Sequence, residues 1–128
     1  MRILLDTHAF LWSVMDDSKL SDRARSIFLD ADNELLISAV IGFEIAIKYT
    51  LGKLELAEPP RDFIENRIRN NALTQLPISL SHTYRLSHLP LHHRDPFDRL
   101  LISQALEEDI PLLSADSAFR LYDVEIIW

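Results

Sequence analysis

Cysteine is absent from this sequence of 128 residues. Without thiols the chain has neither a disulfide framework nor a thiolate metal site, and a reducing, cytoplasmic location is expected. Glycine and proline are scarce, with two and six residues, which excludes long low-complexity stretches. No apolar run approaches the roughly 18 residues of a membrane-spanning helix. The first apolar run is interrupted at Asp6, which argues against a signal peptide.

Hydrophobic residues make up 48% of the chain, enough to fill the core of one domain, and we expect a single domain over residues 1–128. The net charge is −7. Proteins that coat nucleic acid are usually basic, so the charge argues against a simple coating protein. Two possibilities stay open: carboxylates that hold divalent cations against a nucleic acid, and an acidic surface that binds a basic protein.

Short apolar segments alternate with segments of helical periodicity along the whole chain. The apolar segments lack polar alternation, which is typical of strands buried on both faces in a parallel sheet. We therefore predict an α/β fold, with a central parallel β-sheet flanked by α-helices on both faces. Strands are predicted at 3–5, 35–37, 73–78, 111–113 and 124–127, with helices at 7–15, 21–28, 39–51, 60–72, 79–86, 96–106 and 116–122.

Four acidic residues fall near the ends of these predicted strands. Asp6 follows the first strand, and Asp116 comes two residues after the Leu112-Leu113-Ser114 segment. Asp98 lies in the first turn of a predicted helix, and Glu44 lies in the apolar segment Ile41–Ile47. Ligands of open parallel sheets bind outside the carboxyl ends of the strands, so these acids are expected to meet at one edge.

Clustered carboxylates without thiolates suit a hard cation such as Mg²⁺ or Mn²⁺. Such an ion lowers the pKa of a bound water and offsets charge on a leaving oxygen. The chemistry indicated is hydrolysis of a phosphodiester by a metal-activated water, with no side-chain nucleophile.

Each acid also has a structural explanation. Asp6 and Asp116 are placed to cap the helical segments that follow them. Glu44 is spaced to pair with Lys48, four residues later. Asp98 and Asp95 both suit a helix N-terminus through the helix dipole. Spacing alone does not decide between these explanations and a metal site.

Three stretches resemble the PIN-domain family, and within it the VapC-type toxin ribonucleases of bacterial type II toxin–antitoxin systems. They are LLDTHAFLW at 4–12, ISAVIGFEIAIKYTLGKLEL at 37–56, and HHRDPFDRLLISQALEEDIPLLSAD at 92–116, followed by Ser117-Ala118-Phe119. They occur in family order and span nearly the whole chain. The DPFDRLLISQA segment is the most specific of them.

The resemblance implies a Mg²⁺-dependent endoribonuclease acting on RNA, a homodimer, and a cognate VapB-type antitoxin whose C-terminal segment covers the active-site groove. It assigns catalysis and metal binding to Asp6, Glu44, Asp98 and Asp116. It also suggests Asp95 as an outer or phosphate-side residue, and hydroxyls near the metal at Thr7 and Ser114. Arg94 and Arg99 flank the DPFD motif and are candidate phosphate contacts, although a solvated surface charge is the default for such residues. Trp12 with Phe10 is a candidate lining of the antitoxin groove, although Phe10 is favoured as a core residue.

One motif departs from the family pattern. Relatives commonly carry Ser-x-Trp-Glu where this chain has Ile41-Gly42-Phe43-Glu44, so a polar group is missing one turn before Glu44. A zinc site at His92 and His93 was considered and is disfavoured, because adjacent histidines on a loop rarely point at one ion.

Two other functions were weighed. A Mg²⁺ phosphatase that uses Asp6 as nucleophile would need a second acid two residues later, where this chain has His8. A PIN-like interaction module without catalysis is the other alternative, and the intact set of acids argues against it.

Overall fold

The computed structural model describes all residues, 1–128. Its centre is a sheet of five strands in the order β3-β2-β1-β4-β5, with every neighbouring pair parallel. The predicted parallel α/β architecture is therefore confirmed. The strands are β1 (Arg2–Leu5), β2 (Glu34–Ser38), β3 (Thr74–Leu76), β4 (Leu112–Leu113) and β5 (Ile126–Ile127).

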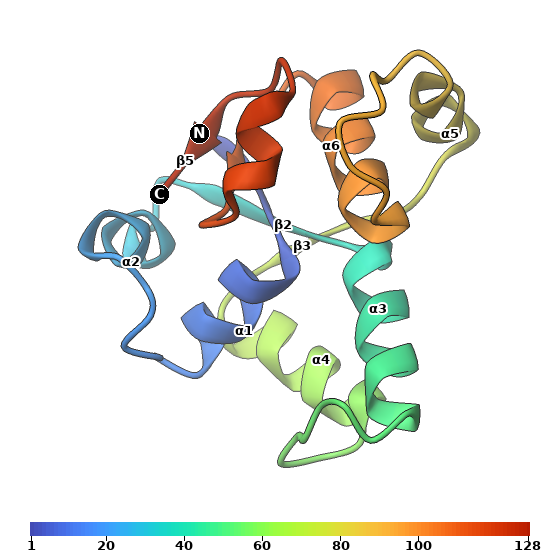
Figure 1. The fold of residues 1–128 in the computed structure, drawn as a ribbon. Helices are drawn as coiled ribbons and strands as arrows, with labels where there is room; N and C mark the ends of the chain where they lie inside the picture. Colours follow the sequence, from blue (N-terminus) through green and yellow to red (C-terminus); the bar gives the residue numbers. More distant parts are fainter.

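Six α-helices and one short 3₁₀ helix connect the strands. Figure 1 shows α1 and α4 on one side of the sheet, and α6 with the 3₁₀ helix η1 on the other. No helix combines the length and apolar character needed to cross a membrane. The helices are α1 (Thr7–Val14), α2 (Asp22–Leu29), α3 (Ala39–Thr50), α4 (Pro60–Asn70), α5 (Leu80–Leu86), α6 (Pro96–Glu108) and η1 (Ser117–Leu121).

The predicted helix starts are explained by side-chain caps. The Ser21 hydroxyl accepts a hydrogen bond from the backbone N–H of Ala24, and the Ser38 hydroxyl accepts one from Val40. Pro60 is the first residue of α4, where a missing N–H costs nothing. After α3 the chain turns at Gly52, whose φ of 72° lies in the left-handed region that glycine favours.

The core explains why the strands lack polar alternation. Ile3, Leu4 and Leu5 of β1 are fully buried, as are Leu112 and Leu113 of β4, because helices cover both faces of the sheet. On one face α6 contributes Leu101, Ile102 and Ala105, the side of this helix that packs inward. The predicted strand at 73–78 is shorter in the structure and spans only Thr74–Leu76.

The order of the strands creates a switch point beside β1. After β1 the chain adds β2 and then β3 on one side of β1. The next strand, β4, pairs with β1 on its opposite side. Helices on the two sides diverge at such a point, leaving a crevice at the carboxyl ends of the two central strands. In this chain those ends are followed by Asp6 and Ser114.

Candidate metal and nuclease site

Asp6 stands at the switch point. Its backbone N–H donates to the carbonyl of Leu113 at 3.1 Å, which continues the β1–β4 pairing by one residue. Its carboxylate accepts hydrogen bonds from the backbone N–H of Ala9, at 2.6 Å, and from the hydroxyl of Ser114. The side chain is almost completely buried, at 4% exposure. Asp6 is thus both the N-cap of α1 and an acid on the floor of the crevice.

Ser114 links Asp6 to Asp116. While its hydroxyl donates to Asp6, its oxygen accepts the backbone N–H of Asp116 at 3.0 Å. Asp116 is exposed, and its carboxylate caps η1 by accepting from the N–H of Ala118 at 2.9 Å. The structure therefore brings Ser114 directly to the acidic site and places Asp116 at its open side.

Glu44 enters the site from α3. It is buried at 5% exposure, and one oxygen accepts the hydroxyl proton of Thr7 at 2.7 Å. The other oxygen pairs with the ammonium of Lys48, four residues later on the same helix. Thr7 follows Asp6 directly, so its hydroxyl ties the acid of α3 to the end of β1. The residue one turn before Glu44, Ile41, is fully buried in the core.

Asp98 enters from the first turn of α6. Asp95 caps this helix by accepting the backbone N–H groups of Phe97 and Asp98, at 2.9 and 3.1 Å. The side chain of Asp98 is 22% exposed, and its carboxylate lies 3.4 Å from the ring nitrogen Nε2 of His93. Asp95 thus fixes the start of the helix, and Asp98 turns its carboxylate toward the crevice.

The electrostatics show that these acids share one site. Burial raises the pKa of Asp6, and its bonds from Ser114 and Ala9 offset only part of that effect. The pKa of the Asp98 carboxyl is raised to about 7, first by burial and then by repulsion from the carboxylates of Asp95, Asp116, Glu44 and Asp6. The carboxylates of Asp95, Asp116, Glu44 and Asp6 therefore all lie near enough to Asp98 to disfavour its charged form.

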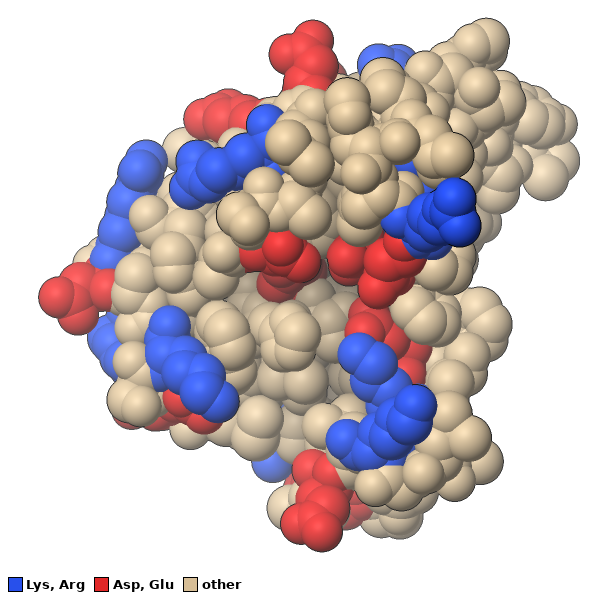
Figure 2. Space-filling model, in the orientation of Figure 1, with Lys and Arg blue, Asp and Glu red and all other residues tan.

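Figure 2 shows a hollow in the molecular surface, with acidic side chains on its floor and walls and basic side chains around its margins. As the side chains stand, no group of three or more His, Asp or Glu residues could hold a metal ion. Oxygen donors are nevertheless the ligands that Mg²⁺ prefers, and Mg²⁺ usually binds through one or two carboxylates while it keeps several waters. The donor chemistry of the hollow therefore fits Mg²⁺, with water supplying part of its shell.

Arg99 does not occupy the place expected of a phosphate contact. It is buried at 8% exposure, and its guanidinium donates to the carbonyls of Leu89 and Pro90 and to the Tyr122 hydroxyl. The expectation that it contacts phosphate is corrected, because its donors are already used to hold the 88–94 loop. Arg94 is exposed in that loop, where it remains a candidate phosphate contact.

His93 and Tyr122 were not predicted as site residues. The Tyr122 hydroxyl lies 2.7 Å from Nδ1 of His93, whose other ring nitrogen faces Asp98. The two residues are 29 positions apart, and no local pattern links them. The adjacent His92 points elsewhere and packs edge-on against the Tyr122 ring.

Of the two aromatic residues considered for the groove, Phe10 lies in the core, as was favoured for it. Phe10 is fully buried and packs edge-on against Phe63, so it belongs to the core and not to a groove. Trp12 is half-buried, stacks on His8 and lies against Trp128. An exposed aromatic residue does occur on α3, where Phe43 packs edge-on against Phe97 of α6.

Comparison with known proteins agrees with this geometry. The family model for the PIN domain matches residues 3–125. The chain therefore belongs to the PIN-domain family. Among characterised proteins, Ribonuclease VapC16 from Mycobacterium tuberculosis is 37% identical over 62 residues, a region that covers 48% of this chain and 44% of that protein. The match thus spans less than half of that relative.

Solved structures share the whole fold at low sequence identity. VapBC2 from Rickettsia felis, bound to a DNA fragment from its promoter, has a TM-score of 0.74 at 18% identity, covering 99% of this chain and 98% of that chain. A toxin–antitoxin complex from Klebsiella pneumoniae has a TM-score of 0.62 at 13% identity, covering 98% and 96%. At these identities the likeness concerns the fold.

Proposed function

We propose that this protein is a Mg²⁺-dependent endoribonuclease, the toxin of a type II toxin–antitoxin pair acting on cytoplasmic RNA. The observation that carries the proposal is the meeting of four acids at the switch point of a PIN-domain sheet. They come from separate parts of the chain, and burial together with repulsion from the neighbouring carboxylates raises the pKa of Asp98 to about 7. Several buried carboxylates in one hollow destabilise the fold unless a cation offsets their charge.

In the proposed mechanism Asp6, Glu44, Asp98 and Asp116 hold the metal, directly or through water; Mn²⁺ would serve equally by ligand type. When bound, the ion supplies a water of lowered pKa and a counter-charge for the phosphate. Ser114 and the Ala9 N–H fix the rotamer of Asp6, and Thr7 with Lys48 fixes Glu44. Basic groups at the margin, with Arg94 the first candidate, bind the flanking phosphates.

The phosphatase alternative is disfavoured by the position of Asp6. Both of its carboxylate oxygens already accept hydrogen bonds, and the side chain is 4% exposed. A nucleophilic aspartate needs a free oxygen in line with the substrate phosphorus. An interaction module without catalysis would have no reason to retain the full set of mutually repelling acids.

Metal removal tests the enzymatic proposal. Purified protein is expected to cleave a mixed RNA substrate with Mg²⁺ present and to lose that cleavage in EDTA, because no side chain replaces the metal-bound water as nucleophile. Adding back excess Mg²⁺ or Mn²⁺ should restore cleavage, as followed on denaturing gels. Undiminished cleavage in EDTA would contradict the metal mechanism.

We further propose that a VapB-type antitoxin binds over the acidic hollow and that the protein forms a homodimer. The acidic floor of the hollow would accept a cationic side chain of such a partner in place of the metal. Expression of the protein alone should arrest growth, and co-expression of the neighbouring gene's product should relieve the arrest. Full growth with abundant soluble wild-type protein would contradict the toxin role.

A further inference from the structure

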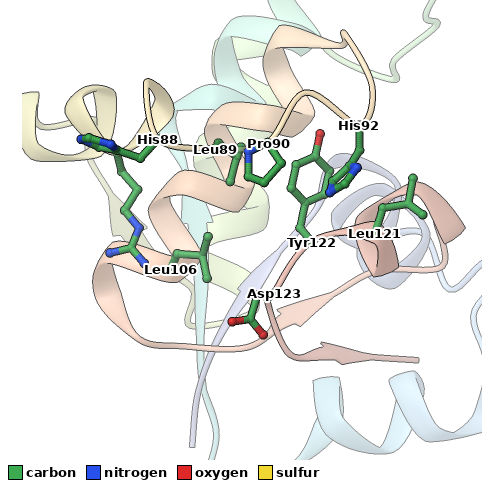
Figure 3. Close-up of a pocket in the computed structure, with 9 residues that line it drawn as sticks. His88, Leu89, Pro90, His92, Leu106, Leu121, Tyr122 and Asp123 are labelled. Atoms are coloured by element: carbon green, nitrogen blue, oxygen red, sulfur yellow. The ribbon is translucent and has the colours of Figure 1, made fainter.

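A second cavity lies beside the acidic hollow. It has a volume of about 420 Å³ and lies between the 88–92 loop, α6 and the segment that follows η1. Cavities of about 300–1,000 Å³ are typical of small-molecule sites. Figure 3 shows His92 and Tyr122 together on one side, His88 on the opposite side and Asp123 below.

The lining of this cavity has three chemical parts. His92 packs edge-on against the buried Tyr122, with ring centroids 4.9 Å apart, so the exposed ring of His92 is the aromatic surface that a base can reach. Leu89 and Leu106 form an apolar wall. Polar groups stand at the margins: Arg85 and His88, with the exposed carboxylate of Asp123.

The cavity and the acidic hollow share a wall. Tyr122 lines the cavity with its ring, while its hydroxyl contacts Nδ1 of His93. The other nitrogen of His93 lies 3.4 Å from the Asp98 carboxylate. A single side chain, His93, therefore separates the ring surface of the cavity from the acids. An RNA strand cleaved at the acids would pass close to the cavity mouth.

We propose that this cavity binds a guanine nucleotide of the RNA strand, next to the phosphodiester that is cleaved. The proposal rests on the proposed ribonuclease function, since it places the cavity along the same strand. In this arrangement the base stacks on the exposed ring of His92, which Tyr122 supports edge-on, and its phosphate lies toward Arg85 and His88. The cavity then selects where the strand is cut.

Guanine is the base that the lining recognises best. Its Watson–Crick edge carries two adjacent donors, the N1–H and the 2-amino group, which match the two oxygens of one carboxylate. Asp123 supplies such a carboxylate at the margin. Adenine and cytosine present a donor beside an acceptor, and uracil presents one donor between two acceptors, so each leaves a carboxylate oxygen facing an acceptor. Stacking on the His92 ring favours all bases alike.

Binding of single nucleotides tests the proposal independently of catalysis. Wild-type protein in EDTA is titrated separately with 5′-GMP, AMP, CMP and UMP, and amide shifts are followed by NMR. We expect shifts at 88–92 and 121–123, with GMP binding at least about tenfold tighter than the others. Asp123→Asn should abolish the preference for GMP and leave the binding of the other three nucleotides unchanged. His92→Ala should weaken the binding of all four nucleotides by a similar factor. Asp62→Asn, which replaces an exposed acid on α4, should change none of these affinities.

The remaining outcomes contradict the proposal. Equal affinity for the four nucleotides, an unchanged GMP preference in Asp123→Asn, shifts at other residues, or no binding at millimolar GMP would each overturn it. Cleavage mapping adds a second test, because wild-type cuts should share a guanine at one fixed distance that Asp123→Asn no longer requires. If GMP binds as expected but no RNA is cleaved, the result supports the nucleotide site in the cavity and contradicts the proposed nuclease activity.

Discussion

Asp98→Asn is expected to abolish RNA cleavage and, in metal-free buffer above pH 7, to make the folded protein more stable than the wild type. The asparagine keeps the shape of the side chain but removes the charge that would hold the metal. In the wild type the pKa of Asp98 rises from 3.8 in the unfolded chain to about 7 in the folded protein. Between these values the folded state binds more protons than the unfolded state, so wild-type stability falls as the pH rises from about 4 to about 7.

Thermal unfolding in EDTA at pH 5 and pH 8 measures this effect. The melting temperature of the wild type should be lower at pH 8 than at pH 5, and this difference should be smaller for Asp98→Asn. Adding Mg²⁺ at pH 8 should raise the melting temperature of the wild type only. Asp22→Asn is the matched control, because Asp22 also lies in the first turn of a helix, α2, but is not among the carboxylates that raise the pKa of Asp98. Parallel pH curves for wild type and Asp98→Asn would contradict the raised pKa.

Arg99→Lys is expected to destabilise the fold by about 2 kcal/mol, although the charge is kept. A lysine ammonium cannot reproduce the guanidinium fork that reaches the carbonyls of Leu89 and Pro90 together with the Tyr122 hydroxyl. The bond to the Tyr122 hydroxyl is buried and the two carbonyl bonds are partly buried. A buried acceptor that loses its donor costs about 1–3 kcal/mol, part of which the lysine recovers. Chemical denaturation measures the free energy of unfolding.

Arg85→Lys provides the comparison for Arg99→Lys. Arg85 makes an exposed pair with Glu107 at 3.4 Å, and exposed pairs contribute about 0–1 kcal/mol, so its replacement should change stability little. Hydrogen exchange gives a local readout: the amides of the 88–94 loop should lose protection in Arg99→Lys only. Equal effects of the two substitutions would show that Arg99 does not hold the loop.

The fold was largely predictable because its signals are local. Apolar runs such as Leu35–Ile37 mark buried strands, and Ser21, Ser38 and Pro60 mark helix starts through bonds or missing donors within a few residues. The position of Asp6 was predictable for a related reason, since carboxyl ends of parallel strands lie at one edge. The short strand at Thr74–Leu76 was predicted too long, because its length depends on pairing with β2 and not on its own residues.

The contacts around the acids depend on pairs that are distant in sequence. The structural explanations do not exclude the functional one: Asp6 and Asp116 do cap helices, and Glu44 does pair with Lys48, while all three raise the pKa of Asp98. Arg99 was predicted to be exposed because most charged residues are. Its carbonyl partners belong to a loop whose path no local sequence pattern specifies. The Tyr122–His93 contact was missed for the same reason.

The bond from Ser114 to Asp6 spans 108 positions of the chain. Contacts of such long range form only after most of the chain is available, so they delay folding. During synthesis the N-terminal acid emerges first, but the strand that completes its surroundings emerges almost last. A nascent chain therefore carries an unassembled hollow until residues near 116 have left the ribosome. In the proposed ribonuclease the acidic site therefore stays incomplete, and the encoding message is protected from it, until translation is nearly finished.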